Sequence, residues 1–118
     1  MKANELMTND WVLYGGKPTR VLQLDKDADC KNAINPIPLT VEIPQKNDWY
    51  QGECGGVTLY FIPNKAFYLA NSYKKGDMAI GVLIDGKMLN LFSIKYVHEL
   101  QHFLRLVGLG GIADNLKI

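Results

Sequence analysis

The chain has 118 residues, of which 47% are hydrophobic and 21% are charged, as in folded globular proteins rather than disordered ones. Its 13 basic and 12 acidic side chains leave a net charge of +1, so no global field draws it to nucleic acid or to an anionic membrane. This length is typical of one domain, and we expect a single domain over residues 1–118.

Cysteine content and hydropathy predict the compartment. A secreted domain stabilised by disulfides would carry more cysteines than Cys30 and Cys54. The spacing of these two cysteines is also not that of a zinc-binding knuckle. We therefore expect two free thiols, although one disulfide stays an alternative. The N-terminal residues have no apolar signal region, and no apolar run approaches the roughly 20 residues that span a bilayer. These features predict a cytoplasmic protein with no membrane contact.

The N-terminal half reads as short strands and connections. Residues 11–14 and 21–24 are rich in β-prone residues and flank the Gly15-Gly16 turn, which predicts a hairpin. This hairpin resembles the opening of a small SH3-like barrel. Pro36 and Pro38 indicate a connector or an edge strand, and Pro44 argues against a long helix over 40–47. The three glycines within 48–56 predict a turn-rich connection.

The second half has stronger signals. Residues 57–62 and 66–70 read as strands, and Asp85-Gly86 predicts a two-residue hairpin between antiparallel strands near 79–84 and 88–92. A helix is expected over 94–107, capped by Ser93 and ended by Gly108, with Leu100 and Leu104 at the centre of its apolar stripe. The predicted fold class is therefore α+β, mostly antiparallel, with an SH3-like N-terminal hairpin and one C-terminal amphipathic helix.

Three stretches carry a family resemblance: residues 4–6 with 9–12, residues 37–40, and the Tyr-Val-His-x-Leu-Gln block that runs from Tyr96 to Gln101. Together they resemble a family of small uncharacterised proteins from gut Bacteroidetes genomes and their phages and mobile elements. The resemblance touches both ends and the middle of the chain, which implies one homologous unit. Members of that family often carry Gln and Asn where this chain has Glu99 and His102, so the resemblance implies that the metal-like string comes and goes on the same helix, and it implies no established activity.

The string His98-Glu99-Leu100-Gln101-His102 is the one motif with evident chemistry. On a helix, residues i and i+4 share a face, so two imidazoles can bind one Zn²⁺ while the intervening Glu activates a metal-bound water. This reading gives a zinc-dependent hydrolase with His98 and His102 as metal ligands and Glu99 as the catalytic residue.

Several features argue against that reading. Only Asp114 is acidic after the motif and no further His exists, so a third ligand would have to come from upstream. The helical angle places Arg105 about 20° from His98, which would set a fixed cation beside the metal. We therefore favour an arrangement in which His98, His102 and Arg105 form the solvent-facing polar side of the helix, with no catalytic residue, metal or cofactor.

The sequence alone does not determine the function. Our preferred hypothesis is a non-enzymatic accessory or interaction domain of phage or mobile-element origin, whose partner is a protein. The alternatives are the zinc-dependent hydrolase and a weak nucleic-acid-binding module built on the SH3-like hairpin. Zinc content would test the first alternative, and salt-dependent binding to oligonucleotides would test the second.

Overall fold

The computed structural model describes residues 6–7, 9–21, 34–71 and 78–118. The chain forms two compact units, each built from two segments that are distant in sequence. Unit 1 comprises Met1–Pro38 and Tyr96–Leu116, and unit 2 comprises Leu39–Lys95 and Lys117–Ile118. In the described residues the strands pair antiparallel in two sheets, and three short helices accompany them, so the α+β class with mostly antiparallel strands is confirmed. That residues 1–118 make one domain stays a prediction.

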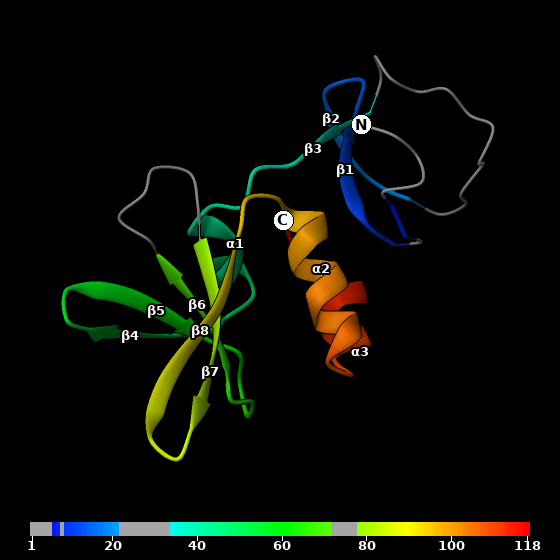
Figure 1. Ribbon diagram of the computed structural model, residues 1–118. Helices are drawn as coiled ribbons and strands as arrows, with labels where there is room; N and C mark the ends of the chain where they lie inside the picture. The colour runs from blue at the N-terminus through cyan, green and yellow to red at the C-terminus, as the bar shows by residue number, and fades with distance from the viewer. Residues whose placement is uncertain (1–5, 8, 22–33, 72–77) are drawn as a thin grey trace. The chain divides into compact units, whose positions relative to one another are not determined.

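Unit 1 contains a three-stranded sheet and two helices (Figure 1). The sheet has the order β2-β1-β3, with β1 at Trp11–Tyr14, β2 at Lys17–Arg20 and β3 at Ile34–Pro36. The predicted hairpin is present, but β2 begins directly after the Gly15-Gly16 turn, because both glycines adopt the positive φ of a two-residue turn. The second strand of the hairpin was predicted over 21–24, and this prediction is wrong because β2 covers Lys17–Arg20. Residues 22–24 lie outside the described residues. Pro36 lies on an edge strand, as expected.

The predicted single C-terminal helix is wrong. Helix α2 covers Val97–Leu106 and a second helix, α3, covers Gly110–Asp114, while unit 2 adds α1 at Glu42–Lys46. Ser93 does not cap α2, since strand β8 continues to Ile94; the N-cap is the extended Tyr96. Gly108 ends the helix as expected, with a φ of 84° that suits glycine. Leu100 and Leu104 are 1% and 0% exposed, which confirms the predicted apolar stripe.

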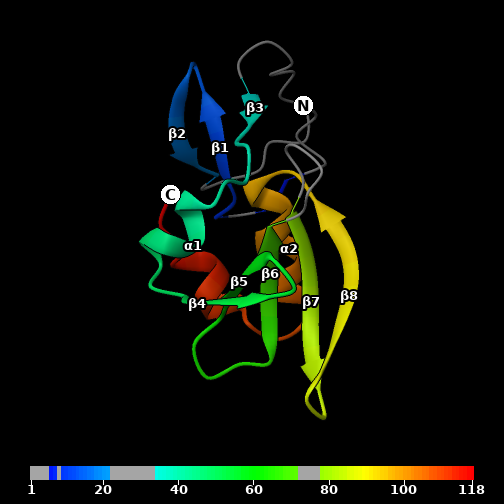
Figure 2. The ribbon, with the colours of Figure 1, turned by 90° about the vertical axis from the view of Figure 1, so that its left-hand side faces the viewer.

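Unit 2 is an antiparallel meander in which each strand pairs with the next (Figure 2). The order β4-β5-β6-β7-β8 runs through Tyr50–Cys54, Val57–Phe61, Phe67–Asn71, Met78–Ile84 and Lys87–Ile94. Strand β4 replaces the predicted turn-rich connection over 48–56, because only Gly55 and Gly56 form the turn and the residues before them pair with β5. The Asp85-Gly86 hairpin is confirmed, with positive φ at both residues.

Tyr68 and Gly81 are in close contact at the centre of this sheet. Tyr68 pairs with Gly81, and its ring lies where a Cβ on Gly81 would be, so only glycine fits there. The Tyr68 hydroxyl donates to Asn90 Oδ1 at 2.7 Å, which ties β6 to β8 across β7. Burial raises the pKa of the Tyr68 phenol above its ordinary value, and negative charge at Cys54 raises it further.

Candidate functional site

The two histidines of the motif lie one helical turn apart on α2. Their ring centroids are 5.6 Å apart at an interplanar angle of 73°, and the His98 ring also stacks on Tyr96 at 5.8 Å. His98 is only 8% exposed, so the prediction that it faces solvent is wrong. The proximity of the two rings follows from i, i+4 spacing and by itself indicates no ligand.

Glu99 has a structural task at the start of the helix. Its Oε1 accepts a hydrogen bond from the Tyr96 backbone N–H at 2.9 Å, which satisfies one of the donors that a helix start leaves exposed. A general base must instead reach the water that it activates, with its carboxylate free to take the proton. The carboxylate of Glu99 is therefore held by the helix terminus rather than presented to a metal-bound water.

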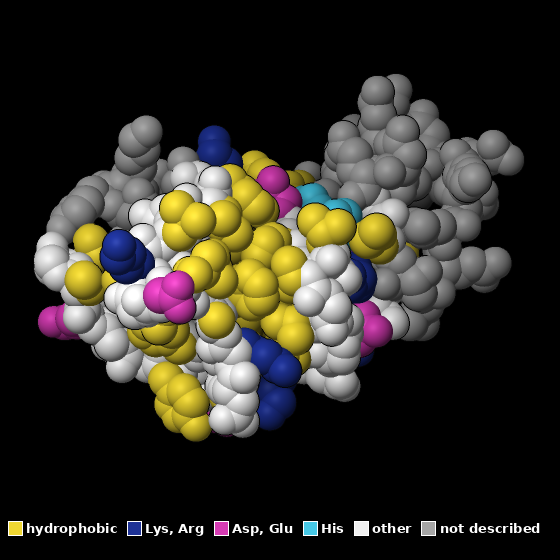
Figure 3. Space-filling model, turned by 60° about the horizontal axis from the view of Figure 1, so that its bottom comes forward, with side chains coloured by type: hydrophobic (Ala, Val, Ile, Leu, Met, Phe, Trp, Pro, Cys, Tyr) yellow, Lys and Arg dark blue, Asp and Glu magenta, His cyan; other side chains and the backbone are white. Residues whose placement is uncertain are grey.

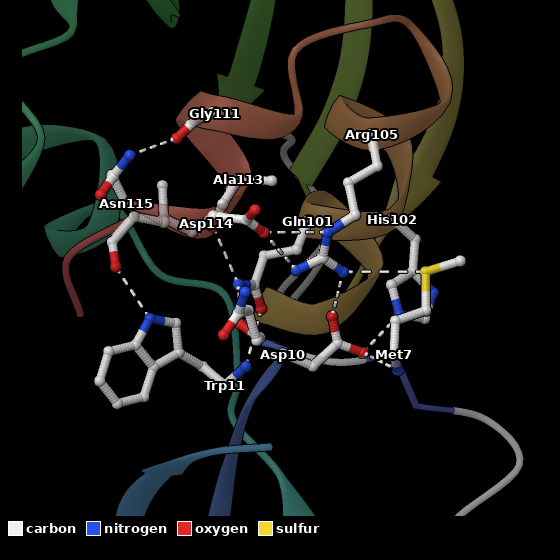
Figure 4. Close-up of polar contacts among 12 residues, drawn as sticks. Met7, Asp10, Trp11, Gln101, His102, Arg105, Gly111, Ala113, Asp114 and Asn115 are labelled. Atoms are coloured by element: carbon white, nitrogen blue, oxygen red, sulfur yellow. Dashed lines mark hydrogen bonds and ion pairs between the residues drawn. The ribbon is translucent and has the colours of Figure 1, made fainter. Parts of the chain in front are cut away.

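Asp10 is the residue at this site that sequence reasoning missed. Its side chain is 0% exposed, and it accepts hydrogen bonds from Met7 N at 2.7 Å, from His102 Nε2 at 2.5 Å and from Arg105 Nη1 at 2.5 Å (Figure 4). A buried carboxylate is stable only when charges and donors surround it, as they do here. Asp10 directly precedes β1 and meets α2 across 92 positions of sequence, so no local motif announces it.

Arg105 lies in this network and not between the histidine rings. Its guanidinium also reaches Asp114 Oδ1 at 3.1 Å, so one cation joins a buried carboxylate and a half-exposed one. The Arg105 side chain is 17% exposed. Because two carboxylates hold the guanidinium, Arg105 is not placed to repel a metal from the imidazoles, contrary to the expectation from the helical angle.

Gln101 corrects the picture of a solvent-facing polar side on α2. The side chain is 0% exposed and makes three hydrogen bonds: Oε1 accepts from Trp11 N at 2.8 Å, and Nε2 donates to Asn9 O at 2.9 Å and to Ala113 O at 3.0 Å (Figure 4). It therefore connects the start of β1, α2 and α3. Gln101, His102 and Arg105 of α2 therefore face an interface within unit 1, where each of the three side chains has a hydrogen-bond partner.

The geometry disfavours a zinc site on the motif. His102 Nε2 is committed to Asp10 and Glu99 to the Tyr96 N–H, while His98 stacks on a tyrosine. A catalytic zinc needs three protein ligands that converge on one point. Within residues 6–7, 9–21, 34–71 and 78–118, no group of three or more His, Cys, Asp or Glu residues has an arrangement that could hold a metal ion.

A second feature is apolar and lies in unit 2. The β7–β8 hairpin extends beyond the other strands of its sheet (Figure 1), and Figure 3 shows one face of the molecule on which hydrophobic side chains are exposed. Six large hydrophobic residues of the hairpin are between 38% and 52% exposed, and we call them the hairpin surface: Leu83, Ile84, Met88, Leu89, Leu91 and Phe92. Clustered exposure of this kind marks binding surfaces, whereas single exposed apolar residues are ordinary.

The expectations about the cysteines, the membrane and the family can be compared with the structure and with known proteins only in part. Cys54 is a free, exposed thiol, and Cys30 lies outside the described residues. No described helix has the length and apolar character needed to cross a membrane. A scan of protein-family models, a search of curated proteins and a search of solved structures each find no match to this chain. The family resemblance and the functional hypotheses drawn from it stay predictions.

Proposed function

We propose that this protein is a non-enzymatic accessory domain that acts through protein contacts, with the exposed β7–β8 hairpin as its binding element. The observation that carries this proposal is the exposure of six large apolar side chains on two adjacent strands. Exposing that much apolar surface to water costs free energy, which burial against a partner recovers at roughly 25 cal/mol per Å². A phage or mobile-element origin and a cytoplasmic location accompany the proposal, on the family resemblance and the hydropathy of the chain.

The polar site in unit 1 supports a non-enzymatic role, because its residues are engaged in structural hydrogen bonds and ion pairs. Asp10, Gln101 and Arg105 hold the start of β1 against α2 and α3, and Glu99 stabilises the start of α2. Each contact satisfies a buried or terminal polar group, which accounts for these residues without substrate chemistry. The zinc-dependent hydrolase would require Glu99 and His102 to leave these partners.

A nucleic-acid-binding module has less support. Strand β2 presents Lys17 and Arg20, but the Arg20 guanidinium lies over the Trp11 ring, 4.7 Å from its centroid. That aromatic face is the one on which a base would stack, and the arginine already covers it. Binding of an oligonucleotide that weakens steeply with salt would favour this alternative over the protein-contact proposal.

Site-specific photo-crosslinking tests the proposed function. A photoreactive amino acid replaces Leu89 on the hairpin surface in the 118-residue chain, expressed in cells that carry the gene. The matched control places it at Leu106, which is 83% exposed but lies on α2. We expect a discrete protein adduct, identified by mass spectrometry as either a second copy or another protein, from position 89 and not from 106. No adduct at 89, or the same adducts at both positions, would refute the proposal.

A further inference from the structure

Both faces of the β7–β8 hairpin carry exposed apolar side chains. Successive side chains of a strand point to opposite faces, and residues that pair across antiparallel strands share a face. Leu83 pairs with Met88, and these two residues make up the first face. Leu89 pairs with Val82 and lies on the second face together with Ile84, which follows Val82 by two positions. Leu83, Met88, Ile84 and Leu89 are each at least 38% exposed, so neither face is covered.

The end of the hairpin is a two-stranded ribbon with an open edge. Strand β6 pairs with β7 as far as Val82, and the Leu83 N–H still donates to Ala66 O at 2.8 Å. Among the described residues, β7 and β8 pair only with each other beyond that point, and no strand follows β8 in the sheet (Figure 2). An edge strand directs part of its backbone N–H and C=O groups away from its neighbour. A partner can therefore reach both faces and the edge between them.

Exposure on two faces restricts the shape of the partner. A flat surface covers one face of such a ribbon, and a strand added along the edge of β8 covers neither. Either partner would leave apolar side chains of the hairpin in water, which is unfavourable. A cleft with a wall on each side covers both faces. Because packed layers lie about 10 Å from a sheet, the two walls would be roughly 20 Å apart.

The charges at the tip favour a protein cleft over the interior of a lipid layer. Asp85 is exposed in the turn, and Lys87 pairs with Ile84 and therefore lies on the second face. A hairpin that entered lipid would carry the Asp85 carboxylate into the hydrocarbon first, which is costly. The net charge of +1 also gives little attraction to an anionic membrane. In a protein cleft, the Asp85 carboxylate can stay in water at the far end, and Lys87 can meet an acidic group on the wall.

We propose that the β7–β8 hairpin binds a different protein by inserting into a cleft with two apolar walls. The wall that faces Ile84 and Leu89 also carries an acidic group that pairs with Lys87. The floor of the cleft supplies hydrogen-bonding groups to the outer edge of β8. This inference rests on the proposed function, since it names the kind of partner for the same hairpin. A second copy of the chain and a lipid layer are the competing occupants.

Photo-crosslinking from both faces tests the cleft. A photoreactive amino acid replaces Leu83 in one variant and Leu89 in another, in the 118-residue chain and in cells that carry the gene. We expect both positions to give an adduct with the same protein. Peptide mapping should place the two adducts on different segments of that protein, one for each wall. The matched control at Leu106, which lies on α2, should give neither adduct.

Charge substitutions test both walls and the acidic group, with the photoreactive residue kept at position 84. Leu83→Lys and Leu89→Lys should each lower the adduct yield at least about fivefold, because each places an unpaired charge against an apolar wall. Lys87→Glu should lower the yield several-fold, whereas Lys87→Arg should retain it. Leu106→Lys should leave it unchanged. Melting temperatures show whether each variant is folded, and Met88→Lys repeats the test of the first face if Leu83→Lys unfolds the chain.

The outcomes separate this inference from the proposed function. An adduct from position 89 and not from 83 refutes the cleft and leaves the proposed function standing, as do adducts made of this chain's own peptides. Equal yields with Lys87→Glu and Lys87→Arg refute the acidic group on the wall. If position 89 gives no protein adduct, both proposals fail. Lipid adducts at 83 and 89, with flotation of the protein on vesicles of phosphatidylcholine and phosphatidylserine, would establish a lipid layer as the occupant instead.

Discussion

Replacing Asp10 with alanine should destabilise the protein by about 3–4 kcal/mol. The side chain is 0% exposed and accepts hydrogen bonds from Met7, His102 and Arg105. Removing one partner of a buried ion pair typically costs about 3–5 kcal/mol, because the other charge stays behind without compensation. Here Arg105 keeps its contact with Asp114 and some exposure to water, which places the expected loss in the lower part of that range.

Urea unfolding followed by tryptophan fluorescence measures this loss. Trp11 follows Asp10 directly and donates its indole N–H to Leu116 O at 2.8 Å, so its emission reports on unit 1. A Trp49→Phe background removes the second tryptophan of the chain. A loss of 3 kcal/mol should also lower the melting temperature by roughly 10 °C.

The matched control is Asp114→Ala, which removes the other carboxylate on the same cation. Asp114 is 45% exposed, so we expect a loss below about 1 kcal/mol. If Asp10→Ala costs no more than Asp114→Ala, the buried carboxylate contributes nothing special to stability. The structural account of this site would then be wrong, and a functional role for Asp10 and His102 would have to replace it.

Four further outcomes are expected. Gly81→Ala should cost about 3 kcal/mol or more by overlap with the Tyr68 ring, and Tyr68→Leu in the same chain should recover part of that loss in urea unfolding. Because burial raises the Tyr68 pKa, its contribution to stability is complete below about pH 10 and is lost as pH rises further, so Tyr68→Phe should flatten the alkaline decline. Leu100→Ala should cost about 2–5 kcal/mol, and the buried His98→Ala about 1–3 kcal/mol; a negligible loss for His98 would mean that it is exposed in solution. Glu99→Ala should cost about 1 kcal/mol by loss of the helix-start contact, whereas stoichiometric zinc in untagged protein and hydrolysis abolished by Glu99→Gln would establish the metal site instead.

Local chemistry made some elements predictable from the sequence alone. Asp85-Gly86 requires a turn with positive φ at both positions, whatever surrounds it, and the hairpin is there. The spacing of Leu100 and Leu104 predicts a buried helical stripe because 3.6 residues per turn place both on one side. The end of α2 at Gly108 follows from the same kind of local preference.

Other features depended on contacts between distant segments. Tyr50–Cys54 contains a glycine and few β-prone residues, so it reads as a connection, yet pairing with β5 makes it a strand. The N-cap of α2 is Tyr96 instead of the predicted Ser93, because Ser93 belongs to β8 and pairs with β7. In both places the partner strand, which the local pattern does not contain, decided the structure.

The candidate site shows the same division. The sequence placed His98 and His102 on one side of a helix, which follows from their spacing alone. It did not place Asp10 beside His102 or bury Gln101 among the backbone groups of β1 and α3, because those contacts join residues up to 92 positions apart. A buried polar group takes its role from the partners that folding supplies. The tertiary structure therefore decided that this motif belongs to a hydrogen-bonded network within unit 1.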